Sequence, residues 1–226
     1  MNFDELLKSF VKQPIKLIAP EVGFDQYMPI DLSTTNPDLN QIDLSHSIAL
    51  STYIQTVLKT HHKTIAYGGY LERRNIYQRS MHFNAQTSDN ERNIHLGVDL
   101  WHNENSPVLA AFDGTIHSFK YNTAYGDYGP TVLLEHDILG VQCFTLYGHL
   151  SLYSLDQIEI GASVSAGDCI GFLGNSQING DYPPHLHFQI IKQLNGHFGD
   201  YPGVCSTVDL EFYQNNCPDP NLILKL

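Results

Sequence analysis

The stretch TVLLEHDILGVQCFTLYG, residues 131–148, decides the fold of this 226-residue chain. It contains two runs rich in β-branched, apolar and aromatic residues, Thr131–Glu135 and Val141–Gly148, with turn-forming residues between them. Short runs of this composition, bounded by Gly, Asp and Asn, are typical of β-strands. The stretch therefore predicts two antiparallel strands joined by a turn.

The same pattern continues on both sides of this stretch, from about Arg92 onward. Most of the chain's 17 glycines also lie in this part. Short strands separated by Gly, Pro, Asn and Asp predict a mainly β fold, an antiparallel β-sandwich or barrel-like sheet pair. The further predicted strands are Pro107–Lys120, Cys169–Leu173 and Leu186–Ile191.

The part before residue 91 has a different character. Apolar residues at helical spacing predict helices at residues 3–12 and 45–62, the second with Ser45 as its N-cap, and residues 13–45 read as extended loop. A last helix is expected at about residues 207–215. These features predict an N-terminal helical and loop extension at 1–90, a central domain at 91–203, and a C-terminal helix and tail at 204–226.

Composition narrows the possible partners. The net charge of −12 repels phosphate backbones, so nucleic acid is not an expected partner. No apolar run reaches the roughly 18 residues of a membrane span. The N-terminus lacks the features of a signal peptide, so we expect a cytoplasmic protein, or a periplasmic or secreted one if the chain is processed. The four cysteines form no C-x-x-C pair and are expected to be reduced, although a Cys205–Cys217 disulfide remains open.

Two histidine clusters stand out among the 12 histidines, and the first is His185-Leu-His187. Two residues apart in a strand, both rings project from one face at about 7 Å from each other along the strand. Zinc–nitrogen bonds are only about 2 Å long, so this spacing suits one ligand and one histidine just outside the ligand shell. By itself, H-x-H is more often an ordinary pair on a strand face.

The second cluster is His95-Leu-Gly-Val-Asp99. In a straight strand these two side chains would lie about 13 Å apart, too far to share an ion. The chain must therefore bend between them if both are ligands, and Gly97 permits an unusual backbone conformation there. A surface turn with a buried histidine explains this motif equally well in isolation. Together, however, the clusters offer two imidazoles and a carboxylate, which suits a catalytic metal that keeps an open position.

From about Arg92 to Ile191 the chain resembles the lysostaphin-like, or LytM-type, zinc metallopeptidase family. The resemblance rests on five segments that occur in the family's order. They are His95–Leu100 (HLGVDL), Pro107–Thr115 (PVLAAFDGT), Tyr147–Ser151 (YGHLS), Gly161–Gly171 (GASVSAGDCIG) and His185–Phe188 (HLHF).

The resemblance implies a function and a role for each matching residue. His95, Asp99 and His187 take the positions of the zinc ligands, with one Zn²⁺ per chain. His149 and His185 take the positions of the two catalytic histidines. The implied activity is that of a metalloendopeptidase that hydrolyses peptide bonds, of the peptidoglycan cross-link type, with a metal-activated water. Any protein partner is unknown.

The upstream segment Tyr70–Tyr77, YLERRNIY, and the downstream segment Gly199–Gly203, GDYPG, resemble a cytosolic subgroup in which this domain is embedded between kinase-like and aminotransferase domains. This similarity favours a zinc hydrolase of a small cytosolic amide or peptide metabolite as an alternative. A second alternative is a non-catalytic binding or regulatory module on the same fold. Arg73 and Arg74 are candidates for binding a substrate carboxylate, although solvated surface arginines are at least as common.

Overall fold

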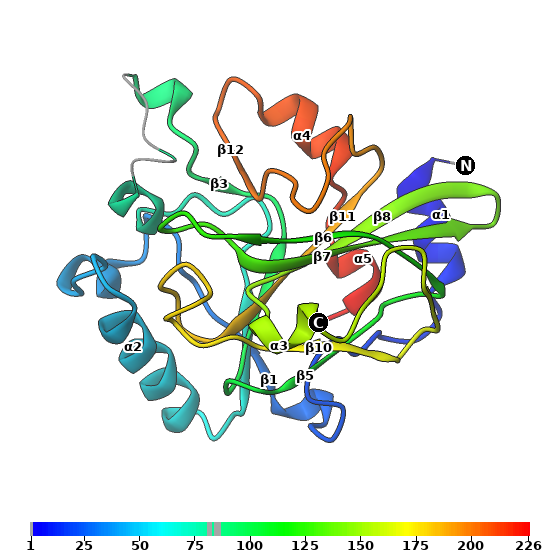
Figure 1. Cartoon of the computed structure of the whole chain (residues 1–226). Helices are drawn as coiled ribbons and strands as arrows, with labels where there is room; N and C mark the ends of the chain where they lie inside the picture. Colours follow the sequence, from blue (N-terminus) through cyan, green and yellow to red (C-terminus); the bar gives the residue numbers. More distant parts are fainter. Residues whose placement is uncertain (1, 81–82, 84–86) are drawn as a thin grey trace.

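The computed structural model describes residues 2–80, 83 and 87–226, and most of its strands lie in one large sheet (Figure 1). The sheet has eight strands in the order β1-β2-β4-β11-β8-β7-β6-β9, and all neighbours are antiparallel except β1 and β2. Two small sheets, β10-β5 and β12-β3, complete the described strands. The predicted mainly β fold is confirmed, with an open sheet in place of a closed barrel.

The strands have short to moderate lengths, as the sequence pattern indicates. Their bounds are β1 Tyr27–Pro29, β2 Ile65–Gly68, β3 Ile94–His95, β4 Val98–Trp101, β5 Pro107–Leu109, β6 Gly114–Asn122, β7 Gly129–Ile138, β8 Val141–Gly148, β9 Ser163–Val164, β10 Cys169–Phe172, β11 His185–Ile191 and β12 Val204–Cys205. The helices are α1 Phe3–Phe10, α2 Ser47–Thr60, α3 Leu152–Leu155, α4 Leu210–Asn216 and α5 Asn221–Leu224.

The strand β11 lies in the middle of the large sheet, between β4 and β8. All seven of its side chains are buried, because both faces of the sheet are covered at this point. Leu186, Phe188 and Ile190 point into the main apolar core, and His185, His187 and Gln189 alternate with them on the other face. The polar face of this central strand is where the candidate site lies.

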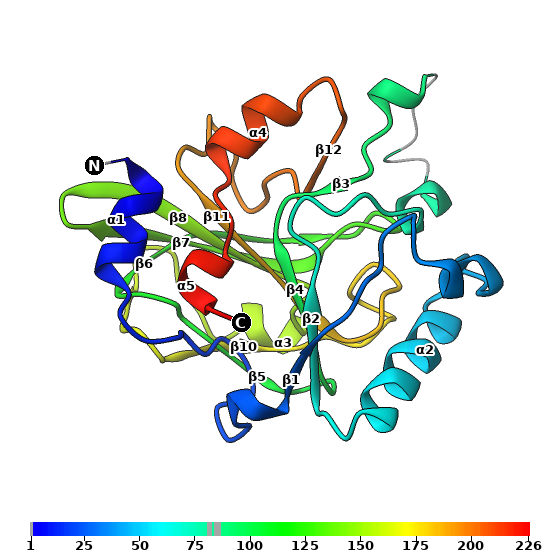
Figure 2. The ribbon, with the colours of Figure 1, turned by 180° about the vertical axis from the view of Figure 1, so that it is seen from behind.

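The residues before 91 extend this sheet. Strand β2 pairs with β4, with Gly68 opposite Asp99, and β1 pairs with β2 (Figure 2). The sequence predicts loop where β1 lies and indicates no strand at β2, because strands of three and four residues are too short to give a clear alternation. Residues on both sides of position 90 therefore share one sheet.

The first and last helices, α1 and α5, lie beside each other in both ribbon views (Figures 1 and 2). The backbone amide of Ile15 donates to the carbonyl of Ile223, and Lys225 donates to the carbonyl of Val11. Helix α2 begins at Ser47 after His46, so the prediction of Ser45 as N-cap is wrong. The Ser45 amide instead donates to Asp43 in the preceding turn.

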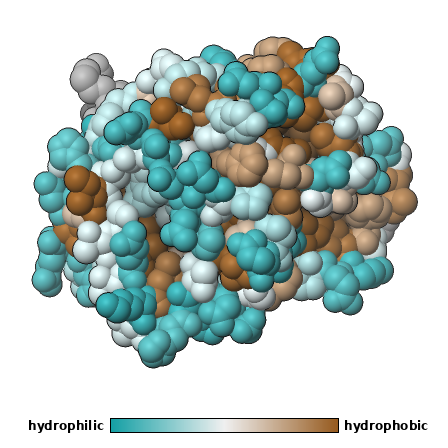
Figure 3. Space-filling model, turned by 60° about the horizontal axis from the view of Figure 1, so that its bottom comes forward, coloured by the Kyte–Doolittle hydropathy of each residue, from teal (hydrophilic) through white to brown (hydrophobic). Residues whose placement is uncertain are grey.

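The surface is mixed in polarity, and the cysteines are unpaired. The face shown in Figure 3 mixes hydrophilic side chains with separate hydrophobic patches. No helix within the described residues has the length and apolar character that a membrane crossing requires. All four cysteines are free thiols, and Cys205 and Cys217 do not form a disulfide.

The chain bends at Gly97, between β3 and β4, as the spacing of His95 and Asp99 requires. The reason for glycine differs from the expectation, because its φ is not positive. A Cβ at Gly97 would instead lie 2.5 Å from the carbonyl oxygen of Phe188 and 2.7 Å from Cε1 of His187. Glycine is needed here because β11 passes close to the bend.

We therefore predict that Gly97→Ala lowers the free energy of unfolding by about 1–3 kcal/mol, since the added methyl group overpacks the bend against β11. Chemical denaturation measures this change. Gly23→Ala is the matched control, because the methyl group would meet only the flexible side chain of Asp25. Equal stability of the two variants would contradict this explanation.

Candidate metal and catalytic site

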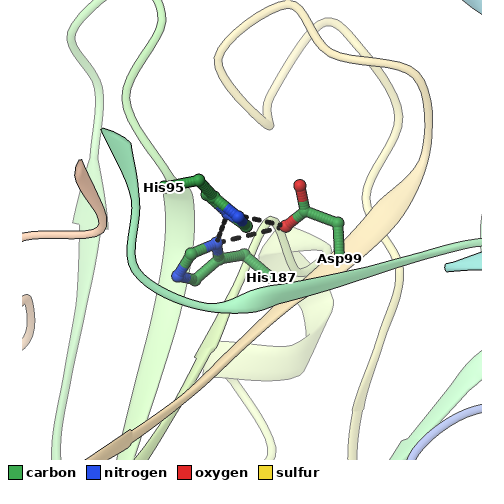
Figure 4. Close-up of side chains that lie close together, drawn as sticks. All are labelled: His95, Asp99 and His187. Atoms are coloured by element: carbon green, nitrogen blue, oxygen red, sulfur yellow. Dashed lines mark hydrogen bonds and ion pairs between the residues drawn. The ribbon is translucent and has the colours of Figure 1, made fainter. Parts of the chain in front are cut away.

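Three predicted site residues bring their donor atoms together on the polar face of the sheet (Figure 4). Nε2 of His95 lies 2.8 Å from Nδ1 of His187, and both nitrogens lie 3.2 Å from Oδ1 of Asp99. Each side chain is at most 3% exposed. Two imidazole nitrogens and one carboxylate oxygen thus face a common point in a buried environment.

The sheet register explains this convergence. His187 on β11 lies directly opposite Asp99 on β4, so their side chains share one face. His95 comes from β3, which pairs with β12 in a different sheet, and reaches the same point because of the bend at Gly97. The strands that hold the cluster are therefore fixed by backbone pairing on both sides.

Hydrogen bonds to the opposite ring nitrogens select the tautomer of each candidate ligand. Nδ1 of His95 donates to the carbonyl of Gly69 at 2.9 Å, which leaves Nε2 free of a proton. Nε2 of His187 donates to Oε1 of Gln189 at 3.1 Å, which leaves Nδ1 free. Such partners orient metal-binding histidines in proteins. Sequence reasoning missed both partners, although Gln189 shares a strand face with His187.

The two other predicted histidines lie beside this cluster. The rings of His149 and His185 are 4.2 Å apart between centroids, and Nε2 of His185 is 3.8 Å from Oδ1 of Asp99. Nδ1 of His149 donates to the carbonyl of Asn179, and Nδ1 of His185 donates to that of Pro183. Each ring therefore keeps an unprotonated Nε2, which makes it a potential proton acceptor.

The backbone at His149 is unusual. Its φ is +65°, a conformation that residues other than glycine adopt rarely and that clusters at functional sites. The loop that follows Gly174 holds the ring in place, since Asn179 donates to the carbonyls of Gly174 and Tyr182. A fixed loop thus presents the His149 imidazole to the cluster.

Tyr128, which was not predicted from the sequence, also lies beside the histidine cluster. The hydroxyl of Tyr128 donates to the carbonyl of Tyr201 at 3.1 Å and lies 3.5 Å from Nε2 of His187. Burial raises its pKa well above the usual value, so it stays protonated. No motif in the sequence distinguishes Tyr128 from the chain's other 12 tyrosines.

A cavity of about 240 Å³ opens onto all five predicted residues. Its lining includes residues that follow β11, such as Asp200 and Tyr201. It also includes Leu50, Ile76 and Tyr77 from the N-terminal part of the chain. The N-terminal extension therefore covers the site as well as extending the sheet.

The two arginines of the N-terminal segment have different surroundings. Arg74 is 4% exposed and makes ion pairs with Glu72 and Asp99, so it is not a solvated surface arginine. Arg73 is exposed and donates to Asn93 and Thr207. Arg74 is thus a partner of the candidate ligand Asp99, which sequence spacing alone could not reveal.

The charges of the cluster follow from burial and from these contacts. Burial lowers the pKa of His95 and of His185 to about 4, and it lowers that of His149 well below the usual value. Burial alone would raise the pKa of Asp99, but His95 and Arg74 hold it well below its usual range. At neutral pH these three histidines are neutral and Asp99 is ionised, the forms in which such side chains bind metal.

Two imidazole nitrogens and one carboxylate oxygen make up the donor set of a candidate metal site. The part of the chain that carries this cluster is similar to known proteins. Residues 93–198 match the sequence profile of Peptidase family M23. This match spans a little under half of the chain, and the segment is similar to that family.

Named relatives match the same part of the chain. The DD-carboxypeptidase/endopeptidase Mpg of Neisseria meningitidis is 37% identical over 103 residues, which are 46% of this chain and 21% of that protein. Lysostaphin of Staphylococcus staphylolyticus is 36% identical over 96 residues, 42% of this chain and 18% of that protein. The similarity thus spans about a fifth of the length of these relatives.

Solved structures include the catalytic domain of lysostaphin from Staphylococcus simulans, 27% identical, with 54% of this chain and 80% of that chain covered. The TM-score is 0.38. The similarity to the family is carried by the sequence match of residues 93–198.

The buried neutral histidines predict a pH dependence of stability. In the unfolded chain His149 and His185 bind protons with a pKa of about 6.5, whereas burial keeps them neutral in the folded protein. The unfolded state therefore binds more protons below that pH, and stability is lost as the pH falls. At pH 5.5 the free energy of unfolding of the metal-free protein should be lower by about 1 kcal/mol for each histidine than at pH 7.5.

Chemical denaturation of the metal-free protein at both pH values tests this. His185→Gln removes one of the two groups and should weaken the pH dependence. A free energy of unfolding that is the same at pH 7.5 and 5.5 would contradict the burial argument.

Proposed function

We propose that this chain is a zinc-dependent metallopeptidase that binds one zinc ion through His95, Asp99 and His187. The observation that carries the proposal is the convergence of their three donor atoms beside two further neutral histidines. Two nitrogens and one oxygen suit zinc, and three protein ligands leave one position open. The donor atoms lie 2.8–3.2 Å apart, close to the roughly 3.3 Å between ligands of a tetrahedral ion with bonds of about 2 Å.

The chemistry divides between the ion and the surrounding side chains. When bound, zinc polarises the scissile carbonyl and makes water a better nucleophile at neutral pH. Nε2 of His149 or His185 accepts the proton of the attacking water, because the Nδ1 of each ring already donates to a backbone carbonyl. The imidazolium formed in this way then donates to the departing amine. Asp99 stays ionised beside them and compensates the positive charge.

We propose peptide bonds of the peptidoglycan cross-link type as the substrate. The names of two relatives support this choice. One is a DD-carboxypeptidase/endopeptidase, and the other, ALE-1 of Staphylococcus capitis, is a glycyl-glycine endopeptidase that is 37% identical over 95 residues, 42% of this chain and 24% of that protein. Both names describe hydrolysis of amide bonds.

A second candidate function has an observation of its own. The N-terminal residues Leu32, Leu50 and Ile76 form part of the cavity wall, and the cavity has a volume of only about 240 Å³. A compact cavity with apolar walls suits a short peptide or a small amide better than a long polymer. In that case the chemistry is the same and the substrate is a small cytosolic amide or peptide metabolite.

Metal content and turnover test the assignment of the five residues. We expect about one zinc per chain in the purified protein and none in His187→Ala, because two remaining ligands do not hold the ion. His149→Ala should retain zinc and lose about 10²–10⁴-fold in turnover, the usual contribution of a general acid–base group. The exposed His61→Ala is the matched control and should change neither property.

The outcomes separate the candidate functions. Zinc bound normally by His187→Ala would contradict the ligand assignment. Unchanged turnover of His149→Ala would contradict its catalytic role. Cleavage of peptidoglycan fragments or glycine-rich peptides supports the first candidate, and cleavage of dipeptides or small amides alone supports the second. Zinc without cleavage of any of these favours the non-catalytic module.

A further inference from the structure

A buried chain of charges links the N-terminal segment to the candidate ligand Asp99. Nη1 of Arg74 donates to Oδ2 of Asp99 at 2.5 Å, and its Nε donates to Oε2 of Glu72 at 2.6 Å. The other oxygen of Glu72 accepts from the backbone amide of Leu32 at 3.0 Å. The guanidinium is therefore fixed on one side by the N-terminal segment and contacts Asp99 on the other.

The two oxygens of Asp99 have different partners. Oδ1 faces His95 and His187, and the other oxygen points away from them (Figure 4). This second oxygen, Oδ2, accepts the hydrogen bond from Nη1 of Arg74. The ion pair with Arg74 thus engages the oxygen that does not face the two histidines. The carboxylate can present only one oxygen to an ion at the cluster, in a fixed orientation.

Other roles of Arg74 do not fit these contacts. Its Nε and Nη1 already donate to Glu72 and Asp99, and only the buried Nη2 has no hydrogen-bond partner among the described residues, so the guanidinium has no second free nitrogen with which to hold a substrate carboxylate. A buried ion pair is also a weak source of stability, because desolvation of both charges offsets most of their attraction. The position of the guanidinium directly behind a candidate ligand indicates an action on that ligand.

We propose that Arg74, held by Glu72, is a positioning residue that orients Asp99 as a one-oxygen metal ligand. This inference rests on the proposed metal site and extends that site to the segment of residues 72–74. Partners of this kind typically contribute 10–100-fold to metal affinity. Arg74 also has an electrostatic effect of opposite sign on metal affinity. Its positive charge by itself weakens the attraction of Asp99 for a cation. The sign of the change in affinity therefore distinguishes the two effects.

The test compares the metal affinity of variants of the 226-residue chain by competition with a chelator, with Zn²⁺ and with Co²⁺ as a spectroscopic probe. Arg74→Met should bind both ions about 10–100-fold more weakly than the unsubstituted protein and should alter the visible Co²⁺ spectrum. Arg73→Met is the matched control, since the neighbouring side chain is exposed and contacts Asn93 and Thr207 instead. It should change neither the affinity nor the spectrum.

Arg74→Lys covers the case in which Arg74→Met does not fold. Lysine keeps the charge but lacks the planar fork that contacts Glu72 and Asp99 together, so its affinity should be intermediate. Equal or tighter binding by a folded Arg74→Met, or an unchanged affinity and Co²⁺ spectrum in Arg74→Lys, overturns the inference. Absence of binding by the unsubstituted protein is a different result, because it overturns the proposed metal site itself.

Discussion

The register between β4 and β11 is the constraint on which the candidate site depends. It places His187 opposite Asp99, and the pairing of β11 with β8 places His187 opposite Gly148, the residue before His149. A shift of one residue would turn His185 and His187 to the opposite face. The fully buried Leu186 and Phe188 prevent this shift, because they would leave the apolar core. The apolar core thus fixes the register of β11 and, with it, the face of the sheet on which His185 and His187 lie.

The N-terminal part of the chain contributes to this arrangement at several levels. Its strand β2 pairs with β4 along Asp99, the carbonyl of Gly69 orients His95, and Arg74 pairs with Asp99. These contacts satisfy the polar groups of a buried cluster that would otherwise carry a large desolvation cost. The residues upstream of the M23 match are therefore structural neighbours of the site and not a separate appendage.

Much of the central region could be predicted from the sequence, and the reasons are local. The runs in 131–148 and 186–191 are long enough for their composition to indicate strands. The H-x-H spacing predicts one ligand and one histidine just outside the ligand shell, and of these two histidines it is His187 whose donor atom lies in the cluster with His95 and Asp99. The contacts of Arg74 could not be predicted, because they join residues 25 positions apart whose proximity depends on β2. The error at Ser45 has another cause. The backbone hydrogen bonds of α2 determine that the helix begins at Ser47 after His46, and residue types alone do not reveal this boundary.

The wide separation of the site residues along the chain also has a consequence for folding. His95 and His187 are 92 positions apart, and β11 must close this long loop to pair with β4. Contacts of such long sequence separation form slowly, because the entropy of closing the loop is lost before the contact stabilises the chain. The complete cluster is therefore a late product of folding. Until β11 is inserted, an ion that is present during synthesis meets at most His95 and Asp99. Full metal affinity therefore requires that β11, which carries His187, has joined the sheet.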